Sequence, residues 1–262
     1  MNIRLLNFGF LKVRASEMIR GVVPGRIREY YAVDEEGNMK IAMNSLLIEH
    51  GGRVVLIDPG CGDFLPKRVL DEYGLEIPVP PEALLQRAGY KETDVTDVVF
   101  THLHFDHGTA AFRRVPGKMV KRYERARYHV SEIHYRYALK PASPEKNSFF
   151  TFVFRTMDEI HMLEQWDSEW MEFLSYNGHT RSMAVPRVTG KDADLVFASD
   201  LLPLRLLTEP GSTSAYDMEP GIQVEEKKNF LESIIRPTLV VLYHDPHDPV
   251  VLLKGGDMTA DR

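Results

Sequence analysis

The chain has 262 residues, of which 44% are hydrophobic and 27% are charged, so it is long enough to form one large domain with a substantial buried core. Its formal net charge of −6 argues against a nucleic-acid partner, because proteins that bind phosphates usually carry an excess of lysine and arginine. The single cysteine, Cys61, excludes an intramolecular disulfide and favours the reducing cytoplasm. The first residues, MNIRLLNFGFLKVRASE, lack an apolar stretch that ends in a cleavage site, so we expect neither a signal peptide nor a membrane partner.

The first part of the chain predicts strands followed by a helix. Residues 3–13 are typical of an opening strand. Two β-rich runs, residues 41–49 and 53–57, flank a His-Gly-Gly turn and predict a β-hairpin. Residues 80–90 begin with proline, carry apolar residues at helical spacing and end at glycine, which predicts a short helix.

The middle of the chain predicts strands that run into polar loops. A buried strand over residues 96–100 leads into such a loop, and a helix is expected to begin near Asp106. Residues 126–139 predict a strand, a serine cap and a helix. Residues 140–165 carry prolines and then aromatic residues, so we expect an insertion that folds over the main body. Within it, the aromatic cluster at residues 149–154 either packs in the core or lines an apolar substrate pocket.

The last part of the chain repeats this alternation of strands and helices. Residues 170–188 predict two strands around a Gly-His loop, and residues 193–204 a buried strand that ends in Ser-Asp. Residues 225–256 predict a helix, a strand, a His-Asp loop and a strand, with the helix broken at Arg236-Pro237. The whole pattern predicts an α/β protein, with a suggestion of two similar halves.

Three of the ten histidines lie within the stretch H-L-H-F-D-H at residues 102–107. This stretch follows a predicted strand, where open α/β sheets gather their chemistry. His102 and His104 alternate in an extended segment and therefore project to the same side. Asp106 and His107 follow as the chain turns. Imidazoles and a carboxylate at this spacing predict a metal site.

Three further predicted loops carry candidate ligands, namely His179 after a glycine, Asp200 after a serine and His244 before an aspartate. The resulting five imidazoles and two carboxylates suit zinc, manganese or iron, and the lack of thiolates argues against a closed structural zinc site. Seven ligands are too many for one tetrahedral ion. The sequence therefore predicts two divalent ions, with one carboxylate shared between them.

The spacing also suggests how the ligands are divided. We expect one ion to be held by His102, His104 and His179, and the other by Asp106, His107 and His244, with Asp200 as the bridge. A water molecule bound to such ions loses its proton near neutral pH, which predicts a hydrolytic nucleophile.

This order of residues, HxHxDH followed by a Gly-His, an Asp and a final His, resembles the metallo-β-lactamase-fold hydrolase superfamily. The segment NSLLIEHGGRVVLIDPGCGD is similar to the hairpin and Asp-x-Gly loop of that family, so the resemblance spans nearly the whole chain. Within the superfamily, GVVP at residues 21–24, ASDLLPL and AYDMEP…EEKKNFLE…YHDP resemble segments of the quorum-quenching lactonase-like branch.

The resemblance implies a single domain over residues 1–262, folded as a four-layer αββα sandwich with two mixed β-sheets and a dinuclear metal site at one edge. It also implies a hydrolase that uses a bridging hydroxide to open a lactone or ester bond of a small-molecule substrate, with Asp106 as a proton shuttle. A homodimer is expected by analogy with the family.

The chain departs from the lactonase pattern in two places. Lactonases continue from the third ligand loop as Gly-His-Thr-Pro-Gly-His, whereas this chain reads GHTRSMA around His179. Lactonases that act on acyl-homoserine lactones also place a tyrosine soon after the bridging aspartate, where residues 201–204 here are Leu-Leu-Pro-Leu. The next tyrosine in this chain is Tyr216, which is the candidate for a contact with the substrate.

Three other functions stay open at this point. A phosphoesterase or nuclease of the same fold is disfavoured by the acidic charge, and we interpret the basic run at residues 113–127 as a solvated helix face. A diiron oxidoreductase would carry a glutamate in place of His104 and an added flavin domain, for which no room remains. A non-catalytic metal-binding module would be favoured by the loss of a ligand, and all seven positions are filled.

Several residues near the motif have less specific roles. Asp58 either accepts a hydrogen bond from a ligand imidazole or caps its strand. Cys61 is expected to be a small buried residue. The other histidines are expected to be core or surface residues, namely His50, His129, His134, His161 and His247.

Overall fold

The computed structural model describes residues 1–155 and 159–254 of the chain. The chain forms two compact units, the first from Met1–Leu11 and Met43–Trp166, the second from Lys12–Ala42 and the chain from Asp167 onward. Strands β1 (Asn2–Arg14) and β2 (Asn38–His50) contribute residues to both units, and each other strand lies within one of them. That the chain is a single domain stays a prediction.

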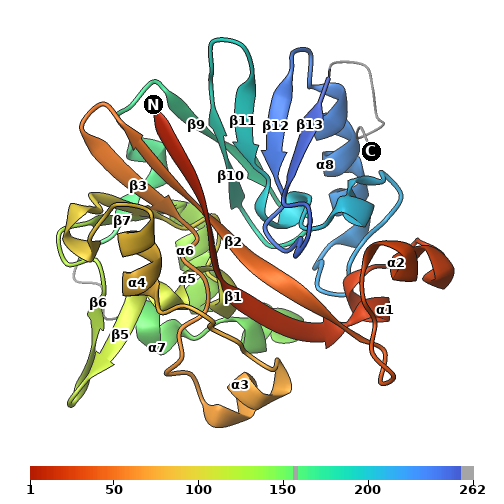
Figure 1. The fold of residues 1–262 in the computed structure, drawn as a ribbon, viewed down its shortest axis with the longest axis horizontal. Coiled ribbons are helices and arrows are strands. Elements are labelled where there is room, and N and C mark those ends of the chain that lie inside the picture. Colours follow the sequence, from red (N-terminus) through yellow and green to blue (C-terminus); the bar gives the residue numbers. More distant parts are fainter. Residues whose placement is uncertain (156–158, 255–262) are drawn as a thin grey trace. The chain divides into compact units, whose positions relative to one another are not determined.

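The main sheet of the first unit has six strands in the order β1-β2-β3-β4-β7-β8 (Figure 1). Its later strands are β3 (Arg53–Ile57), β4 (Asp97–Val99), β7 (Arg127–Val130) and β8 (His161–Met162). Strand β3 is antiparallel to β2, whereas β3, β4, β7 and β8 run parallel to one another, so the sheet is mixed. The loops that follow the parallel strands therefore emerge at the same edge of the sheet.

The predicted opening strand and hairpin are confirmed. In the hairpin, His50 pairs with Arg53 and Glu49 with Val54, which leaves only two residues in the turn. These residues, Gly51 and Gly52, have φ angles of 57° and 78°. A two-residue turn with positive φ at both positions matches the right-handed twist of the flanking strands, and glycine adopts that conformation without strain.

The helices of the first unit are short. The predicted helix at residues 80–90 is α4 (Pro81–Arg87), and the one after the serine cap is α6 (Glu132–Leu139). Ser131 caps α6, with its Oγ accepting a hydrogen bond from the His134 amide. The remaining helices are α3 (Lys67–Glu72), α5 (Phe105–Gly108), α7 (Thr151–Phe154) and the 3₁₀ turns η1 (Glu92–Asp94), η2 (Thr109–Ala111), η3 (Ser143–Ser148) and η4 (Leu163–Gln165).

The basic run at residues 113–127 is not a helix face, and that expectation is wrong. It begins with an antiparallel hairpin of β5 (Phe112–Val115) and β6 (Lys118–Lys121), joined at Pro116-Gly117. Gly117 has a φ angle of 82°. Proline fixes the first turn position and glycine accepts positive φ at the second, so this dipeptide ends any helix and closes a turn.

The segment at residues 140–165 packs against other residues of the first unit. Residues 156–158 lie outside the described part of the chain. The buried ring of Phe154 lies 6.2 Å from the ring of Phe100 and 5.8 Å from that of Phe112. Phe149 is also buried, whereas Phe152 is 44% exposed. Part of the aromatic cluster therefore packs in the core of the unit.

The sheet of the second unit has five strands in the order β13-β12-β11-β10-β9 (Figure 1). Their bounds are β9 (Met171–Tyr176), β10 (Met183–Val188), β11 (Asp194–Phe197), β12 (Thr238–Val241) and β13 (Val250–Leu253). Only the β11–β12 pair is parallel, so this sheet is mixed as well. The predicted strands in residues 170–188 and 193–204 are confirmed.

Helix α8 (Pro220–Glu232) covers this sheet through Phe230, which packs in a buried cluster with Val196, Val240 and Val251. The helix begins five residues earlier than expected, because Pro220 suits the first helical position. It ends four residues before the expected break at Arg236-Pro237. The other helices of the unit are α1 (Ala15–Met18), α2 (Pro24–Tyr30), η5 (Ser199–Leu201) and η6 (Arg205–Thr208).

The predicted α/β class with two mixed sheets is confirmed by these two units. None of the helices that the structure describes has the length and apolar character needed to cross a lipid bilayer.

Asp97 organises the buried start of β4. Its carboxylate is fully buried and accepts hydrogen bonds from Arg53, Arg127, Thr96 and His129, with the His129 Nε2 at 2.8 Å and the Arg53 Nη2 at 2.7 Å. Burial alone would raise the pKa of Asp97, but the hydrogen bonds from His129, Arg53 and Thr96 outweigh it and hold the pKa well below its usual range.

Asp97→Asn is expected to lower the free energy of unfolding by about 3 kcal/mol at pH 7, because the variant removes the buried charge that pairs with Arg53 and Arg127. The folded-state pKa of Asp97 is depressed. The contribution of Asp97 to the free energy of unfolding is therefore present above about pH 4 and is lost as the pH falls further. Urea unfolding at pH 7 and pH 3 should therefore show a smaller difference between the two proteins at pH 3. Asp71→Asn, at an exposed position of α3, is the control, and an equal loss in both variants would contradict this role of Asp97.

Candidate metal centre

The H-L-H-F-D-H stretch lies directly after β4, at the edge of the sheet where β3 and β7 also end. His102, His104 and His107 are buried, and Asp106 is partly buried in the first turn of α5. The backbone of this loop is fixed by His134, whose Nε2 accepts a hydrogen bond from the Leu103 amide at 2.9 Å. The parallel strands thus place the loop with the four predicted ligands of the first unit at this edge of the sheet.

Asp58, which follows β3, holds this loop from the neighbouring strand end. Its carboxylate accepts hydrogen bonds from the Thr101 amide at 2.8 Å and the Thr101 hydroxyl at 2.5 Å. Its Oδ2 also lies 2.9 Å from the His107 Nδ1. The prediction that Asp58 binds a ligand imidazole is confirmed for this contact. Asp58 has a φ angle of 46°, a strained conformation of the kind that non-glycine residues adopt at functional sites.

These contacts fix the proton positions on His102 and His107. Burial raises the pKa of Asp58, and the hydrogen bonds from His107 and Thr101 oppose that rise. With Asp58 as the acceptor, His107 carries its proton on Nδ1 and presents a lone pair on Nε2. The Thr101 hydroxyl donates to Asp58, so it accepts from the His102 Nδ1 at 3.0 Å, which leaves a lone pair on the His102 Nε2.

His104 is held by a residue that the sequence did not reveal. Its Nε2 lies 2.7 Å from Oε1 of Glu145, a buried glutamate in η3. A carboxylate accepts at this contact, so the proton sits on Nε2 and the lone pair on Nδ1 of His104. Glu145 follows a proline-rich stretch with no motif, and nothing in its sequence context signals this contact.

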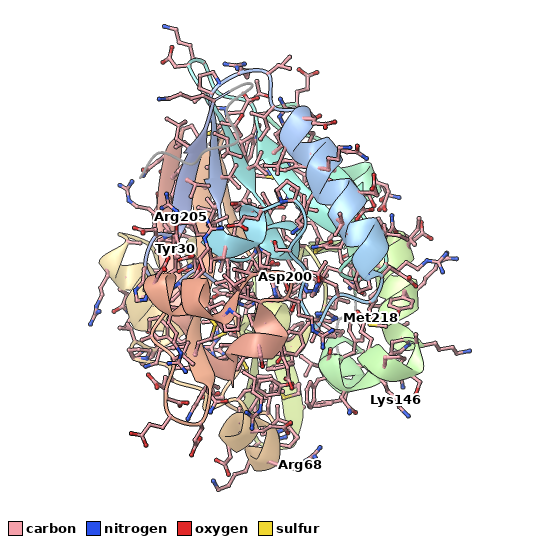
Figure 2. All side chains as sticks on the ribbon, turned by 90° about the vertical axis from the view of Figure 1, so that its right-hand side faces the viewer. Tyr30, Arg68, Lys146, Asp200, Arg205 and Met218 are labelled. Carbon is pink, nitrogen blue, oxygen red and sulfur yellow. The ribbon has the colours of Figure 1, made fainter. Side chains whose placement is uncertain are left out.

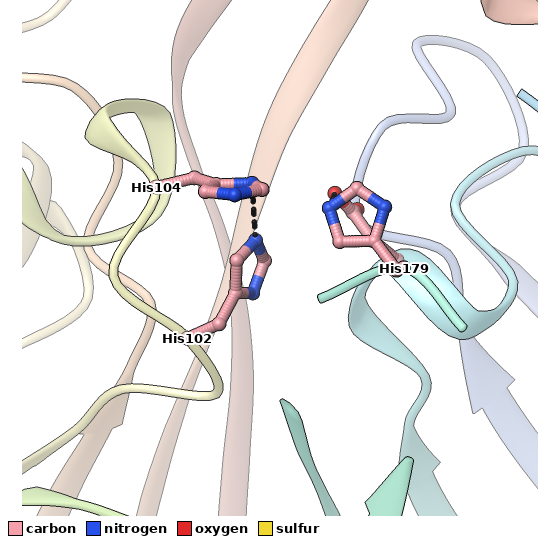
Figure 3. Close-up of side chains that lie close together, drawn as sticks. His102, His104 and His179 are labelled. Atoms are coloured by element: carbon pink, nitrogen blue, oxygen red, sulfur yellow. Dashed lines mark hydrogen bonds and ion pairs between the residues drawn. The ribbon is translucent and has the colours of Figure 1, made fainter. Parts of the chain in front are cut away.

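The lone pairs of His102 and His104 face one another. The His102 Nε2 lies 3.1 Å from the His104 Nδ1 (Figure 3). Since the protons of both neutral rings are engaged by oxygen acceptors on their other nitrogens, this contact brings two acceptors together. Two facing acceptors require an additional proton or a cation, and two imidazole lone pairs are a typical ligand set for a divalent metal.

The second unit gathers the other three predicted ligands. His179 lies in the loop between β9 and β10, and its Nδ1 is 3.1 Å from Oδ1 of Asp217. Its Nε2 is 3.1 Å from Oδ2 of Asp200. Asp217 lies next to the candidate residue Tyr216, in the AYDMEP segment that resembles the lactonase-like branch, but no role was predicted for it. As in the first unit, one ring nitrogen is bound to a carboxylate outside the predicted ligand set.

His244 completes this group after β12. Its Nδ1 donates a hydrogen bond to the Ala42 carbonyl at 2.8 Å, and its Nε2 lies 3.4 Å from Oδ1 of Asp200. A carbonyl only accepts, so Nδ1 of His244 is protonated and Nε2 carries the lone pair. Asp200 therefore presents one oxygen to His179 and the other to His244. Asp200 is only 6% exposed.

The backbone around Asp200 is held by helix α8. The Gln223 Nε2 donates to the carbonyls of Asp200 and Leu201 at 2.8 Å and 3.3 Å. Ser199, directly before Asp200, has a φ angle of 48°. The turn after β11 therefore has a strained backbone at Ser199 and is held by hydrogen bonds from Gln223 of α8. This arrangement orients the Asp200 carboxylate toward both histidines.

The donor set fits a divalent metal on these grounds. Each of the five histidines has one nitrogen engaged by an oxygen, from Thr101, Glu145, Asp58, Asp217 or the Ala42 backbone. Such a contact fixes the tautomer of a metal-binding imidazole and its orientation, and leaves the second nitrogen as a ligand atom. The chemistry of these groups is that of a divalent metal centre.

The remaining predicted residues lie close to these groups. The Asp106 Oδ2 is 3.9 Å from the His107 Nε2. Tyr216 is partly buried, and its amide donates to the Ser214 hydroxyl at 3.2 Å, in the loop that carries Asp217. Cys61 is buried as expected, and burial raises the pKa of its thiol well above the usual range, which keeps it protonated.

Comparison with known proteins gives one family. Residues 42–252 match the model of the metallo-beta-lactamase superfamily. No curated protein sequence matches the chain.

Several solved structures have the same fold. A probable metal-dependent hydrolase from Staphylococcus aureus superposes with a TM-score of 0.87 at 20% identity, over 99% of this chain and 94% of that one. The hydrolase AbOPH of the beta-lactamase superfamily gives a TM-score of 0.75 at 18% identity, over 98% and 91%. AidC, a dizinc quorum-quenching lactonase in complex with a product, gives 0.74 at 16% identity, over 95% and 89%.

Proposed function

Because the chain belongs to the metallo-β-lactamase superfamily, we propose that it hydrolyses a lactone or ester bond of a small molecule at a dinuclear metal centre. Family membership and the buried histidine and aspartate groups identify it as a metal-dependent hydrolase. The substrate class and the number of ions are the parts that we propose.

We propose that the seven predicted ligands are divided between two ions. One ion would be held by His102, His104 and His179 and the other by Asp106, His107 and His244, with Asp200 as the shared ligand. Zinc is the preferred ion, because four or five ligands from imidazole and carboxylate suit its coordination, and manganese or iron are the alternatives. AidC, a dizinc lactonase with the same fold, supports the count of two.

Such ions, when bound, lower the pKa of a water molecule toward neutrality and polarise a carbonyl oxygen. The residues of the chain supply the rest. Asp58, Glu145 and Asp217 hold the imidazoles in the orientation that the ligand nitrogens need. We propose that the Asp106 carboxylate accepts the proton given up by the attacking water and passes it to the leaving alkoxide, and that Tyr216 contacts the substrate.

The observation that carries this proposal is the convergence of metal-ligating atoms within each unit. In the first unit the lone pairs of His102 and His104 face one another, and in the second the Nε2 atoms of His179 and His244 lie 3.1 Å and 3.4 Å from the two oxygens of Asp200. A core of acceptors without a cation would be costly to bury, so these contacts are explained by metal binding. A lactone or ester is preferred as the substrate because the lactonase-like branch and AidC share this fold.

The test combines metal analysis with a substrate panel. Metal-free protein is reconstituted with zinc, manganese or iron and assayed on lactones, aryl esters, thioesters and phosphate esters. We expect about two ions per chain, and lactone or ester hydrolysis at least about 100-fold faster than with the metal-free protein. Activity on phosphate esters alone would favour the phosphoesterase alternative, and full metal loading without any hydrolysis would indicate a non-catalytic module.

A further inference from the structure

Glu145 is a buried carboxylate in a segment whose function the ligand pattern does not explain. It is 3% exposed, whereas the next residue, Lys146, lies at the surface (Figure 2). We propose that Glu145 is a positioning residue that increases the metal affinity of His104, an inference that rests on the proposed metal centre. In this role Glu145 acts on the metal only through the His104 imidazole.

The two oxygens of Glu145 have separate partners. Oε1 lies 2.7 Å from the His104 Nε2, and Oε2 accepts a hydrogen bond from the Tyr137 hydroxyl at 2.5 Å. The Tyr137 hydroxyl in turn accepts from the Ala142 amide at 3.3 Å. Helix α6 therefore fixes the carboxylate plane through Tyr137, and the carboxylate fixes the imidazole of His104.

A buried aromatic ring packs against both His104 and Tyr137 in this chain of contacts. The ring of Phe149 lies 4.9 Å from the ring of His104 and 6.2 Å from that of Tyr137. Phe149 is itself buried. Hydrogen bonds in such a setting are less screened than in water, so the carboxylate acts strongly on the imidazole.

The contact has a chemical consequence at the opposite nitrogen. An ionised carboxylate that accepts the Nε2 proton increases the electron density of the ring and makes Nδ1 a stronger ligand. A carboxamide of the same size can accept the same hydrogen bond but carries no charge. Glu145→Gln therefore removes the effect of the charge on the His104 imidazole and keeps the size of the side chain. A loss of metal affinity in this variant would be due to the charge and not to packing.

The experiment measures the dissociation constant of zinc in competition with a chelator, for metal-free wild type and variants. Glu145→Gln is expected to weaken the tighter zinc site about 10- to 100-fold, and Tyr137→Phe to weaken it less. The cobalt-substituted protein is expected to show a shifted visible absorption band in Glu145→Gln. Glu72→Gln, an exposed glutamate at the end of α3, is the control and should match the wild type.

Each outcome decides the matter. Unchanged zinc affinity in Glu145→Gln, with wild type binding zinc, would overturn the proposal and leave the hydrolase function intact. A lower unfolding midpoint of the metal-free variant with unchanged affinity would assign Glu145 a packing role and overturn it as well. If Glu145→Gln does not fold, Tyr137→Phe decides, since wild-type affinity there would also overturn it. A wild type that binds zinc and hydrolyses nothing would refute the proposed function alone, and one that binds no divalent ion would refute both.

Discussion

Asp200→Ala is expected to reduce kcat/KM for lactone or ester hydrolysis by about 1000-fold or more and to lower the amount of bound metal. The reason lies in the second unit, where one oxygen of Asp200 faces His179 at 3.1 Å and the other faces His244 at 3.4 Å. A single carboxylate thus contributes to both proposed ions, and alanine removes both contacts. Steady-state kinetics and metal analysis of the purified variant measure the two effects.

Asp192→Ala is the matched control, because Asp192 is exposed and lies in the turn that precedes β11. The metal-free form of Asp200→Ala should be at least as stable as metal-free wild type, since the substitution removes a buried charge. With zinc present, wild type should gain stability and the variant should gain less. Wild-type activity in Asp200→Ala would exclude Asp200 as a metal ligand.

The sequence predicted the candidate ligands best where polar residues directly follow a predicted strand. The parallel order of β3, β4 and β7 brings Asp58 and the H-L-H-F-D-H loop to one edge, as a pattern of strands followed by polar residues predicts. His179, Asp200 and His244 were likewise found from their positions after predicted strands, and they lie together in the second unit. These features depend on local periodicity and on the rule for parallel sheets, both of which can be read from one sequence.

The residues that orient the ligands could not be found in this way. Glu145 and Asp217 are separated from their histidines by 41 and 38 positions in the sequence, and the ligand pattern assigns neither of them a role. Ala42 contributes through its carbonyl, which any residue possesses. Such contacts depend on the tertiary path of the chain rather than on residue type at a fixed spacing. The hairpin of β5 and β6 could have been predicted, because Pro116-Gly117 is a turn signal. The basic character of residues 113–127 led instead to the expectation of a helix face.

The loop between η6 and the Asp217 segment is held by a buried lysine of α8. The Lys227 Nζ donates to the carbonyls of Leu207 and Glu209 at 3.0 Å and 3.1 Å, and to the carbonyl and hydroxyl of Ser212. Lys227 is 1% exposed. Burial lowers the pKa of Lys227 to about 8, although the charges of Asp217 and Glu209 oppose that shift.

Lys227→Met is expected to lower the free energy of unfolding by about 3 kcal/mol at pH 7, because methionine fills the space but removes the Lys227 donor from the carbonyls of residues 207 and 212. Urea unfolding measures the effect, and Lys228→Met, at the exposed neighbouring position, should change stability by less than about 0.5 kcal/mol.

The pH dependence supplies an independent check on the same lysine. The folded-state pKa of Lys227 lies below its unfolded value of 10.5, so the unfolded chain binds more protons between about pH 8 and 10.5. Stability due to this group therefore rises with pH across that window. The difference in unfolding free energy between wild type and Lys227→Met should widen from pH 8 to pH 10. A constant difference would mean that Lys227 keeps an ordinary pKa in the folded protein, and a difference near zero would mean that its four hydrogen bonds do not stabilise the loop.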